Sequence, residues 1–319
     1  MAAIALSTLT DLEKVSYVRE GLPVAKPKLI YSQYAVKDRV AKREGKTRQW
    51  FRFTKPALTS GSSGNFSGYT YEKNQTGTPP TWTPATPADT TVTAAVDFLF
   101  GQGHEWNEGV EYTSFADIPK ELRNLNTMHA AEAIDTEVRD MLVAGTNVAY
   151  ADGVATRPDL QADDYIDMVD IFNAVTTLRN NDAPTINGMY SALCSANVIT
   201  ELMRDTAFQS AIQFQKPYIF TGTIAELYGV RFDFSSRAAT TSNGGSASQI
   251  ATIDQTIITG DNAYGKTAWM LDDYDIVYTK PGGFGDEWAV RNALTWKFMF
   301  KSVILNQSWM LRLESSRRA

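Results

Sequence analysis

The chain is 319 residues long, with 43% hydrophobic and 21% charged residues, which is the composition of a folded protein with room for one large core or two adjoining ones. Its net charge of −6 excludes the basic excess of a surface that neutralises nucleic-acid phosphates. No stretch reaches the ~18 uncharged apolar residues of a membrane span, and the N-terminus lacks the regions of a secretion signal. We therefore expect a protein made in the cytosol, without tight DNA binding and without a membrane segment.

The single cysteine, Cys194, lies in an apolar run and has no partner within the chain, so intrachain disulfides are excluded. A free cysteine packs as a small hydrophobic residue. We expect a buried structural thiol in a protein assembled under reducing conditions.

Residues 1–34 are interrupted by Gly21, Pro23 and Pro27, and the prolines block a continuous helix, so this segment is predicted to be an extended arm. Residues 37–55 follow with eight basic and two acidic side chains, while the chain as a whole is acidic. Segregated charge predicts contacts between basic and acidic patches on different copies or domains. A solvated basic face explains the pattern equally well.

Two aromatic or β-branched stretches, 47–53 and 92–100, are predicted strands. Between them lies a polar tract rich in Gly, Ser, Thr and Pro, which cannot bury enough apolar surface to form a core of its own. Two strands with such a tip predict a projecting two-stranded loop. This loop must find partners outside its own domain or stay mobile.

From Asn124 the apolar period changes to that of a long amphipathic helix, with Gly145 as its expected C-cap. Glu132, Asp135 and Glu137 are expected off the apolar stripe. The predicted stripe consists of Leu125, Met128, Ala131, Ile134, Val138, Met141 and Leu142.

The middle of the chain interleaves strands and helices, which predicts one compact α/β or α+β domain. The C-terminal part has the clearest period-two pattern, because Leu294, Trp296, Phe298 and Phe300 share one face of a long strand. A second strand is expected after a turn near Asn306. The remaining expected elements are helices at 164–178 and 196–214, strands at 188–195, 228–234 and 250–259, and a surface loop at 240–246.

Residues 260–267 read Gly-Asp-Asn-Ala-Tyr-Gly-Lys-Thr and match the nucleotide-binding pattern G-x-x-x-x-G-K-[ST]. That site requires a helix opening at Lys266 and Thr267, whose N–H groups hold the phosphates. The residues that follow predict a turn and a strand instead, and Asp261 would repel phosphate. We therefore expect a chance match. A nucleotide hydrolase that uses Lys266 and Thr267 remains the enzyme alternative.

No other constellation predicts chemistry. His104 and His129 have no Cys or His at metal-ligand spacing, and no G-x-S-x-G elbow accompanies them. The acidic pairs at 163–164 and 272–273 lack EF-hand spacing, and the glycine-rich run 282–285 lacks the dinucleotide-binding spacing. The sequence thus predicts no catalytic, cofactor-binding or metal-ligating residues, and no enzyme.

Taken together, the chain reads as an arm, a basic strand pair with a long tip, a long helix, a mixed domain and terminal strands. This order, and five stretches of sequence, resemble the major capsid proteins of tailed bacteriophages with the HK97-like fold, and among them the N4-like subfamily. The likeness covers the chain from about Lys37 onward, although the tip at 61–87 is longer and richer in Pro and Thr. The stretches are 45–47, 137–153, 228–232, 260–265 and 301–314.

The resemblance implies an α+β capsid fold in which the extended loop lies over a neighbouring subunit and the loop at 280–288 approaches local threefold contacts. The sequence shows no large removable segment before the arm, so we expect that a scaffold, if one is used, is a separate protein. The implied division is an N-terminal arm at 1–34, the extended loop at 35–110, the peripheral domain with its spine helix at 111–154, the axial domain at 155–270 and the peripheral strands at 271–319.

The implied function is a major capsid protein that assembles in the bacterial cytoplasm, through hexamers and pentamers, into the icosahedral head of the virion. The shell would enclose DNA without sequence-specific binding. Further implied partners are scaffolding, portal and cement proteins. Another structural virion protein, such as a fibre or decoration module, is the second alternative.

Overall fold

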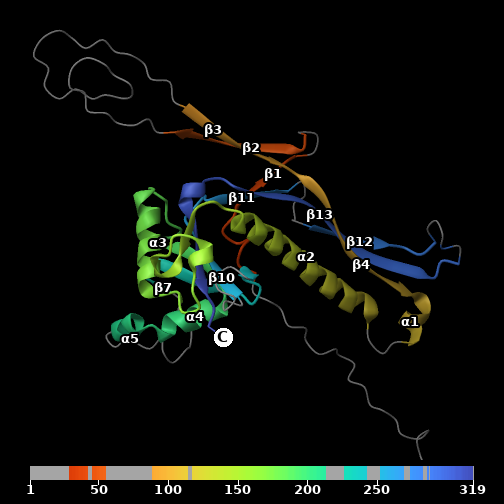
Figure 1. Cartoon of the computed structure of the whole chain (residues 1–319). Helices are drawn as coiled ribbons and strands as arrows, with labels where there is room; N and C mark the ends of the chain where they lie inside the picture. The colour runs from red at the N-terminus through yellow and green to blue at the C-terminus, as the bar shows by residue number, and fades with distance from the viewer. Residues whose placement is uncertain are drawn as a thin grey trace, which may run out of the picture.

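The computed structural model describes residues 29–41, 45–54, 88–113, 117–212, 226–242, 252–268, 274–282, 286 and 288–318. Two sheets, a long helix between them and a projecting hairpin make up an α+β architecture (Figure 1). Among the described residues, no helix is long and apolar enough to cross a membrane.

The larger sheet has seven strands in the order β5-β14-β10-β6-β8-β7, with β9 also paired to β10. The central strands are buried on both faces, and all seven residues of β14 are buried. The strands are β5 (Val148–Tyr150), β6 (Tyr190–Cys194), β7 (Glu226–Leu227), β8 (Val230–Phe234), β9 (Thr240–Ser242), β10 (Thr252–Thr259) and β14 (Met310–Ser316).

The seven-stranded sheet separates two hydrophobic cores. On β14, Leu311 and Leu313 face the core formed with helices α3 and α4, while Met310 faces the core formed with α2. Cys194 is fully buried in the first core, as predicted. The helices on this side are α3 (Met168–Asn180), α4 (Ala196–Arg204) and α5 (Thr206–Ile212).

The smaller sheet has five strands built around the long strand β13, which pairs with β11, β12 and β4. The predicted alternation holds: Leu294, Trp296, Phe298 and Phe300 are all buried on one face. The strands are β1 (Val36–Arg39), β4 (Asp97–Asn107), β11 (Tyr264–Ala268), β12 (Tyr274–Thr279) and β13 (Arg291–Ile304). The short helix α1 (Glu108–Thr113) follows β4.

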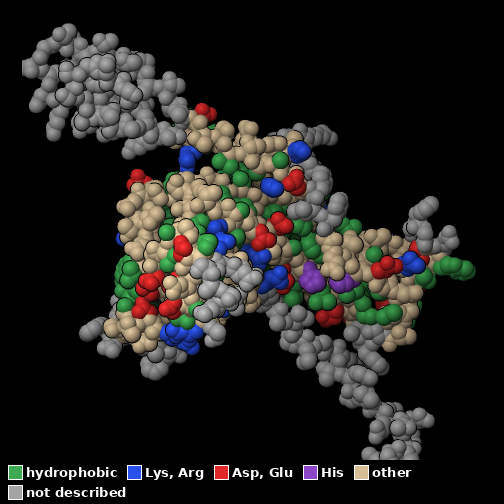
Figure 2. Space-filling model, in the orientation of Figure 1, with side chains coloured by type: hydrophobic (Ala, Val, Ile, Leu, Met, Phe, Trp, Pro, Cys, Tyr) green, Lys and Arg blue, Asp and Glu red, His purple; other side chains and the backbone are tan. Residues whose placement is uncertain are grey.

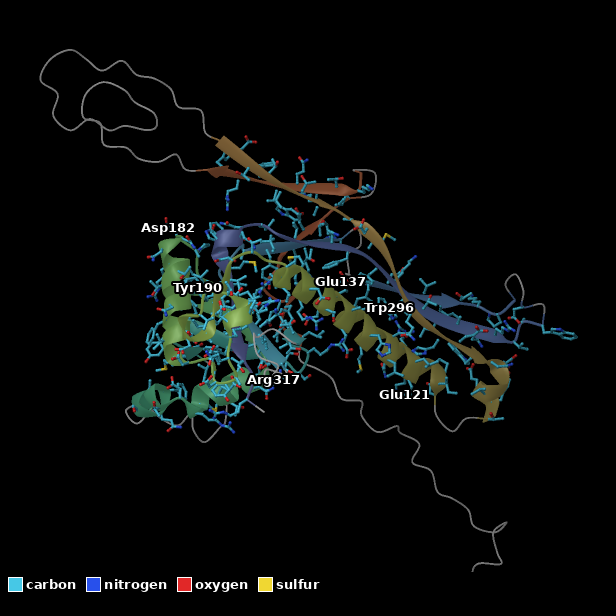
Figure 3. All side chains as sticks on the ribbon, viewed as in Figure 1. Glu121, Glu137, Asp182, Tyr190, Trp296 and Arg317 are labelled. Carbon is cyan, nitrogen blue, oxygen red and sulfur yellow. The ribbon has the colours of Figure 1, made fainter. Side chains whose placement is uncertain are left out.

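The long helix α2 (Ile118–Val143) packs beneath this sheet, near the buried Trp296 (Figure 3). Asp117 caps its N-terminus by accepting a hydrogen bond from the Lys120 N–H. The predicted stripe is only partly right: Leu125, Met128 and Ala131 are half-buried. The buried stripe has four-residue spacing and consists of Asn126, Ala130, Ile134, Val138 and Leu142.

A two-stranded antiparallel ribbon, β2 (Thr47–Thr54) and β3 (Ala88–Ala95), projects from the body, as the sequence predicted (Figure 1). The predicted second strand is in fact two, because the chain breaks at Val96 before β4 enters the five-stranded sheet. The ribbon's tip, the N-terminal 28 residues and the acidic pair at 272–273 lie outside the described residues.

Other boundaries also differ from the sequence predictions. The expected helix at 196–214 is broken at Asp205, whose extended backbone ends α4 and whose carboxylate accepts from the N–H groups of Ala207 and Met168. Part of the expected surface loop, residues 240–242, is strand β9. The expected C-cap glycine, Gly145, follows the actual C-cap Ala144 and lies against Met310, where a Cβ would come within 2.8 Å.

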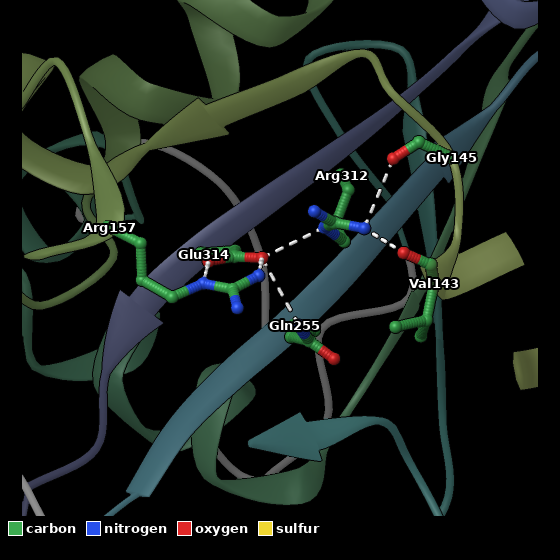
Figure 4. Close-up of polar contacts among 6 residues, drawn as sticks. All are labelled: Val143, Gly145, Arg157, Gln255, Arg312 and Glu314. Atoms are coloured by element: carbon green, nitrogen blue, oxygen red, sulfur yellow. Dashed lines mark hydrogen bonds and ion pairs between the residues drawn. The ribbon is translucent and has the colours of Figure 1, made fainter. Parts of the chain in front are cut away.

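A buried charged network joins the end of α2 to the seven-stranded sheet (Figure 4). Glu314, with no exposed side-chain surface, receives hydrogen bonds from Arg157 (2.5 Å from Nε and 2.5 Å from Nη2) and from Gln255 (3.1 Å). It also pairs with Arg312 at 2.8 Å. The Arg312 guanidinium donates to the carbonyls of Val143 and Gly145, so it caps the C-terminal end of α2.

Candidate assembly surfaces

The backbone conformation of residues 260–267 excludes the nucleotide-binding alternative. Thr259 ends a strand, a turn follows, and Lys266 and Thr267 lie inside strand β11 rather than at the start of a helix. Both side chains are buried, at 4% and 0% exposure, and the Lys266 ammonium lies 6.0 Å from the centroid of the Phe300 ring. A buried strand cannot present its lysine to a phosphate.

Packing explains the motif's two glycines. A Cβ on Gly260 would lie 2.6 Å from the Pro184 carbonyl oxygen, and one on Gly265 would lie 3.2 Å from Leu305. The N–H groups that would cradle a phosphate are already used, because Gly260 donates to the Trp309 carbonyl and Asp261 donates to that of Pro184. The match is a chance one, as the sequence predicted.

The two histidines, far apart in sequence, lie side by side on one face of the molecule (Figure 2). His104 on β4 and His129 on α2 have ring centroids 6.3 Å apart. In the part of the chain that the structure describes, no group of three or more His, Cys, Asp or Glu side chains is placed to hold a metal ion. Asp164 serves a turn, since it accepts from the Gln161 N–H at 2.7 Å.

The outer face of the β2–β3 ribbon exposes large apolar side chains. Phe51 and Phe53 are 71% and 68% exposed, and they alternate with Arg52, which lies on the opposite face. Their cross-strand partners are Thr91 and Asp89. A two-stranded ribbon with exposed phenylalanines is not stable on its own in water, so this face is suited to contact with another molecule.

The inner face of the ribbon lies over a cavity of about 300 Å³ between the ribbon and the body. Trp50 and Val92 line it from the ribbon, and Leu305 and Trp309 line it from the body. The Arg52 guanidinium lies 5.7 Å from the centroid of the Trp309 ring, which bridges the two sides by a cation–π contact.

Charge in the basic stretch is partly neutralised within the chain. Arg48 on β2 pairs with Asp38 on β1 at 2.6 Å, so one basic side chain connects the ribbon to the five-stranded sheet. This pair belongs to one subunit. The predicted contact between basic and acidic patches of different copies stays a prediction.

A second exposed aromatic residue lies in the loop between β12 and β13. Trp288 is 87% exposed. Two residues before it, the Asp286 carboxylate accepts from the N–H groups of Gly282, Val290 and Arg291 at 3.0–3.1 Å. These hydrogen bonds lower the pKa of the Asp286 carboxyl. A large apolar side chain is thus presented to solvent beside a residue that is hydrogen-bonded to both ends of the connection.

A third apolar patch lies on α3 and the turn before β8. Phe172 and Tyr228 pack against each other with ring centroids 4.1 Å apart, and each is 40% exposed. Val169, one turn earlier on α3, is 56% exposed. Val169 and Phe172 both belong to the helix that the sequence predicted at 164–178, whose buried side is formed by Ile171, Val175 and Leu178.

Comparisons with known proteins place these surfaces on a known fold. No protein-family model matches the chain, and no curated protein matches it in sequence. Solved structures do match over nearly the whole chain. The fold is that of HK97-like phage capsid proteins.

Three of the similar structures illustrate the match. The chain in "Cyanophage Pam1 capsid asymmetric unit" has a TM-score of 0.72 at 11% identity, covering 99% of this chain and 100% of that one. The Helicobacter pylori bacteriophage KHP30 capsid chain has a TM-score of 0.70 at 12% identity, covering 99% of each chain. The Ralstonia phage GP4 capsid chain has a TM-score of 0.67 at 13% identity, covering 100% of this chain and 99% of that one.

Proposed function

We propose that this chain is a major capsid protein that assembles with identical copies into the icosahedral head of a tailed phage. The observation that carries the proposal is the completeness of the structural match, since 94–100% of each of the capsid chains from phages Pam1, KHP30, GP4 and P-SCSP1u is covered. A fold shared over a single element would leave the role open. A fold shared from one end of the chain to the other supports the same structural role.

The exposed apolar surfaces support a subunit whose apolar side chains are buried by contacts with neighbouring copies. Phe51 and Phe53 on the ribbon, Trp288 on the β12–β13 loop, and Phe172 on α3 lie on three separate parts of the molecule. A subunit inside a closed shell has neighbours on every side within the shell, so it needs several apolar contact surfaces rather than one. The role is therefore structural, without a catalytic step.

The proposed division, with 1–34 as arm and 35–110 as extended loop, follows the two sheets only in part. The peripheral domain at 111–154 and 271–319 supplies α2 and the strands β12 and β13 of the five-stranded sheet, and the axial domain at 155–270 supplies α3, α4 and the strands β6 to β10 of the seven-stranded sheet. The other strands cross these boundaries: β5 and β14 of the larger sheet belong to peripheral segments, β11 of the smaller sheet belongs to the axial segment, and β1 and β4 belong to the extended loop. The chain passes between the two sheets at two further places, because β10 of the larger sheet is followed by β11 of the smaller one, and β13 of the smaller sheet is followed by β14 of the larger one.

Finer assignments are part of the same proposal. The stretches quoted above favour the N4-like subfamily of these capsid proteins. In the proposed virion the chain forms hexamers and pentamers, meets scaffolding, portal and cement proteins during assembly, and encloses DNA without reading its sequence. The net charge of −6 supports a subunit that holds packaged DNA without adhering to it tightly.

Electron microscopy and sedimentation of the purified full-length chain test the proposal. We expect closed particles of uniform diameter or ring-shaped capsomers. Filaments, flat sheets or a protein that stays monomeric at high concentration would contradict it. Filaments or sheets would favour the fibre or lattice alternative.

A further inference from the structure

Residues 29–35 form neither helix nor strand, yet they are part of the core beneath the five-stranded sheet. Ile30 and Tyr31 are 0% and 1% exposed, and they pack with the α2 residues Ala130, Ile134 and Val138. An irregular segment leaves its backbone N–H groups without the partners that a helix or strand would supply. Those groups therefore need acceptors from elsewhere in the chain.

Asp135 on α2 supplies the acceptor. Its carboxylate accepts from the N–H groups of Tyr31 and Ser32, both at 2.9 Å, and from that of Ile30 at 3.4 Å. The side chain is 4% exposed. Three successive N–H groups that converge on one carboxylate form an anion-binding nest. Burial raises the pKa of the Asp135 carboxyl, and the three N–H groups act in the opposite direction.

The same segment is held from the other side of the core. The Tyr264 hydroxyl on β11 donates to the Tyr31 carbonyl at 2.6 Å, and the Tyr31 hydroxyl accepts from the Ala239 N–H at 3.0 Å. The Tyr34 hydroxyl donates to Asp233 on β8 at 2.5 Å. The segment is therefore fastened to α2, to the five-stranded sheet and to the seven-stranded sheet within five residues.

We propose that Asp135 is a positioning residue, which fixes residues 29–35 and thereby the point at which the N-terminal arm starts. The inference rests on the proposed function, in which residues 1–34 form an arm that contacts a second copy of this chain. If residues 29–35 were not held, the arm could start in many orientations, and binding of the arm to a neighbouring copy would lose the conformational entropy of those orientations. Because the hydrogen bonds to Asp135 already order residues 29–35 in the free subunit, this part of the entropy loss does not have to occur on assembly.

The chemistry of the position supports a dedicated role. Aspartate is a poor helix former in a helix interior, and a buried carboxylate is unfavourable unless it is hydrogen-bonded. A hydrophobic residue at 135 would remove both costs, but it would leave three N–H groups without this acceptor, those of the buried Ile30 and Tyr31 and of the half-buried Ser32. The carboxylate is thus explained by the segment that it binds and not by the helix that carries it.

Hydrogen–deuterium exchange of the full-length chain tests the fastening directly. In Asp135→Asn, the amide replaces one acceptor oxygen by an NH₂ group, and we expect exchange of a peptide covering 29–35 to be about tenfold faster. Peptides from β14 should keep their protection. The matched control is Glu137→Gln, the same charge change on the exposed side of α2 two residues away (Figure 3), which should leave all rates unchanged.

Two exchange results would overturn the proposal: unchanged exchange at 29–35 in Asp135→Asn, or equal loss of protection throughout the chain. Where Asp135→Asn does not fold, wild-type exchange decides the matter. The Ile30, Tyr31 and Ser32 amides must then exchange as slowly as those of a core strand, and rapid exchange would contradict the nest.

The yield of assembled particles distinguishes a positioning role of Asp135 from a role in subunit stability alone. We expect Asp135→Asn to keep the wild-type melting temperature to within a few degrees and yet to yield fewer closed particles than wild type and Glu137→Gln. If wild type assembles and Asp135→Asn assembles equally well, the positioning role is wrong and the capsid function stands. If wild type forms no shell or capsomer, the proposed function itself fails, whatever the exchange data show.

Discussion

Every residue of β14 is buried, whereas on β2 the side chains of Phe51 and Phe53 remain 71% and 68% exposed. Both strands are seven or eight residues long and both contain large apolar residues. β14 lies between β5 and β10 in a sheet covered on both faces, while β2 pairs with β3 alone in the part of the chain that the structure describes. Strands of similar length and composition therefore differ in role: β14 stabilises the fold by burying its side chains, whereas β2 leaves apolar surface exposed, which the proposed function assigns to contacts with other copies.

The largest expected effect on folding is at Glu314, the buried centre of the charged network. Glu314→Gln removes the charge that Arg157 and Arg312 share, and should lower the free energy of unfolding by about 3–5 kcal/mol because both guanidinium groups lose their counter-charge. Chemical denaturation measures it. Glu105→Gln is the control, because its 3.6 Å pair with Arg291 is exposed and should matter by about 0.5 kcal/mol or less. Equal effects of the two variants would contradict the assignment.

The next effect is a pH dependence at Asp170 in the capping box of α3. Burial, and then the neighbouring Asp167, raise the pKa of Asp170 to about 7, so between pH ~4 and pH ~7 the carboxyl is protonated in the folded state and ionised in the unfolded chain. The contribution of this group to the free energy of unfolding is therefore complete below pH ~4 and decreases as the pH rises to about 7. Asp170→Asn should therefore gain roughly 2 kcal/mol over wild type between pH 5 and pH 8.

Melting curves of Asp170→Asn and wild type at the two pH values measure the gain. Asp182→Asn is the control for a charge removed near the other end of α3, because Asp182 is exposed and its left-handed backbone suits asparagine. A pH dependence that is the same in Asp170→Asn and in wild type would show that Asp170 does not hold the proton.

On the ribbon, the expected effect on folding is small and the effect on association is large. Phe51→Ser/Phe53→Ser should change the free energy of unfolding of the subunit by no more than about 0.5 kcal/mol, because both side chains are already in water. The variant should nevertheless fail to form closed particles, as seen by sedimentation. Phe51→Leu/Phe53→Leu keeps apolar surface at both positions and should still assemble. Normal assembly of the serine variant would remove this face from the shell contacts.

The smallest expected effect on the subunit is at Trp288. Trp288→Ala should leave the melting temperature unchanged, since 87% of the residue is exposed and the hydrogen bonds from Gly282 and Val290 to Asp286 remain. Its effect should appear only in the concentration needed for assembly, measured by light scattering, which should rise severalfold. A fall in melting temperature would mean that Trp288 packs within its own subunit.

Much of the fold could be predicted where one face of an element is buried and the other is solvated. The alternation of Leu294, Trp296, Phe298 and Phe300 predicted β13 because the period of a strand is two. The rejection of a nucleotide site at 260–267 was also right, since the residues after Lys266 do not form a helix. In both cases local pattern and final environment agree.

The errors arise where polar side chains are buried by specific partners. Asn126 belongs to the buried stripe of α2 because its side-chain amide donates to the Leu294 carbonyl at 2.9 Å, and Asp135 is buried because it binds residues 30–32. Neither partner is near in sequence. Hydrophobic periodicity therefore placed Asp135 on the exposed side, and no local signal could have corrected it.

The candidate surfaces were only partly visible in the sequence. The aromatic-rich strand at 47–53 was predicted. A strand pattern does not show, however, whether the other face of a two-stranded ribbon packs against a sheet or is exposed to solvent. The sequence predicted the helix that carries Phe172 but not the exposure of this side chain, which lies between the buried Ile171 and the buried Ala174 and Val175 in the sequence. Exposure depends on which elements pack on a face, and that is a property of the whole chain.

The place of β14 in the sheet also bears on how the polypeptide is made. β5 pairs in parallel with β14, whose residues follow it by some 160 positions, and it has no other strand neighbour in the described part of the chain. At ~5–20 residues per second, a ribosome needs roughly 8–30 s to make the intervening chain. During synthesis, β5 therefore has no strand partner among the described residues until β14 has been made, so the seven-stranded sheet is completed only late in synthesis.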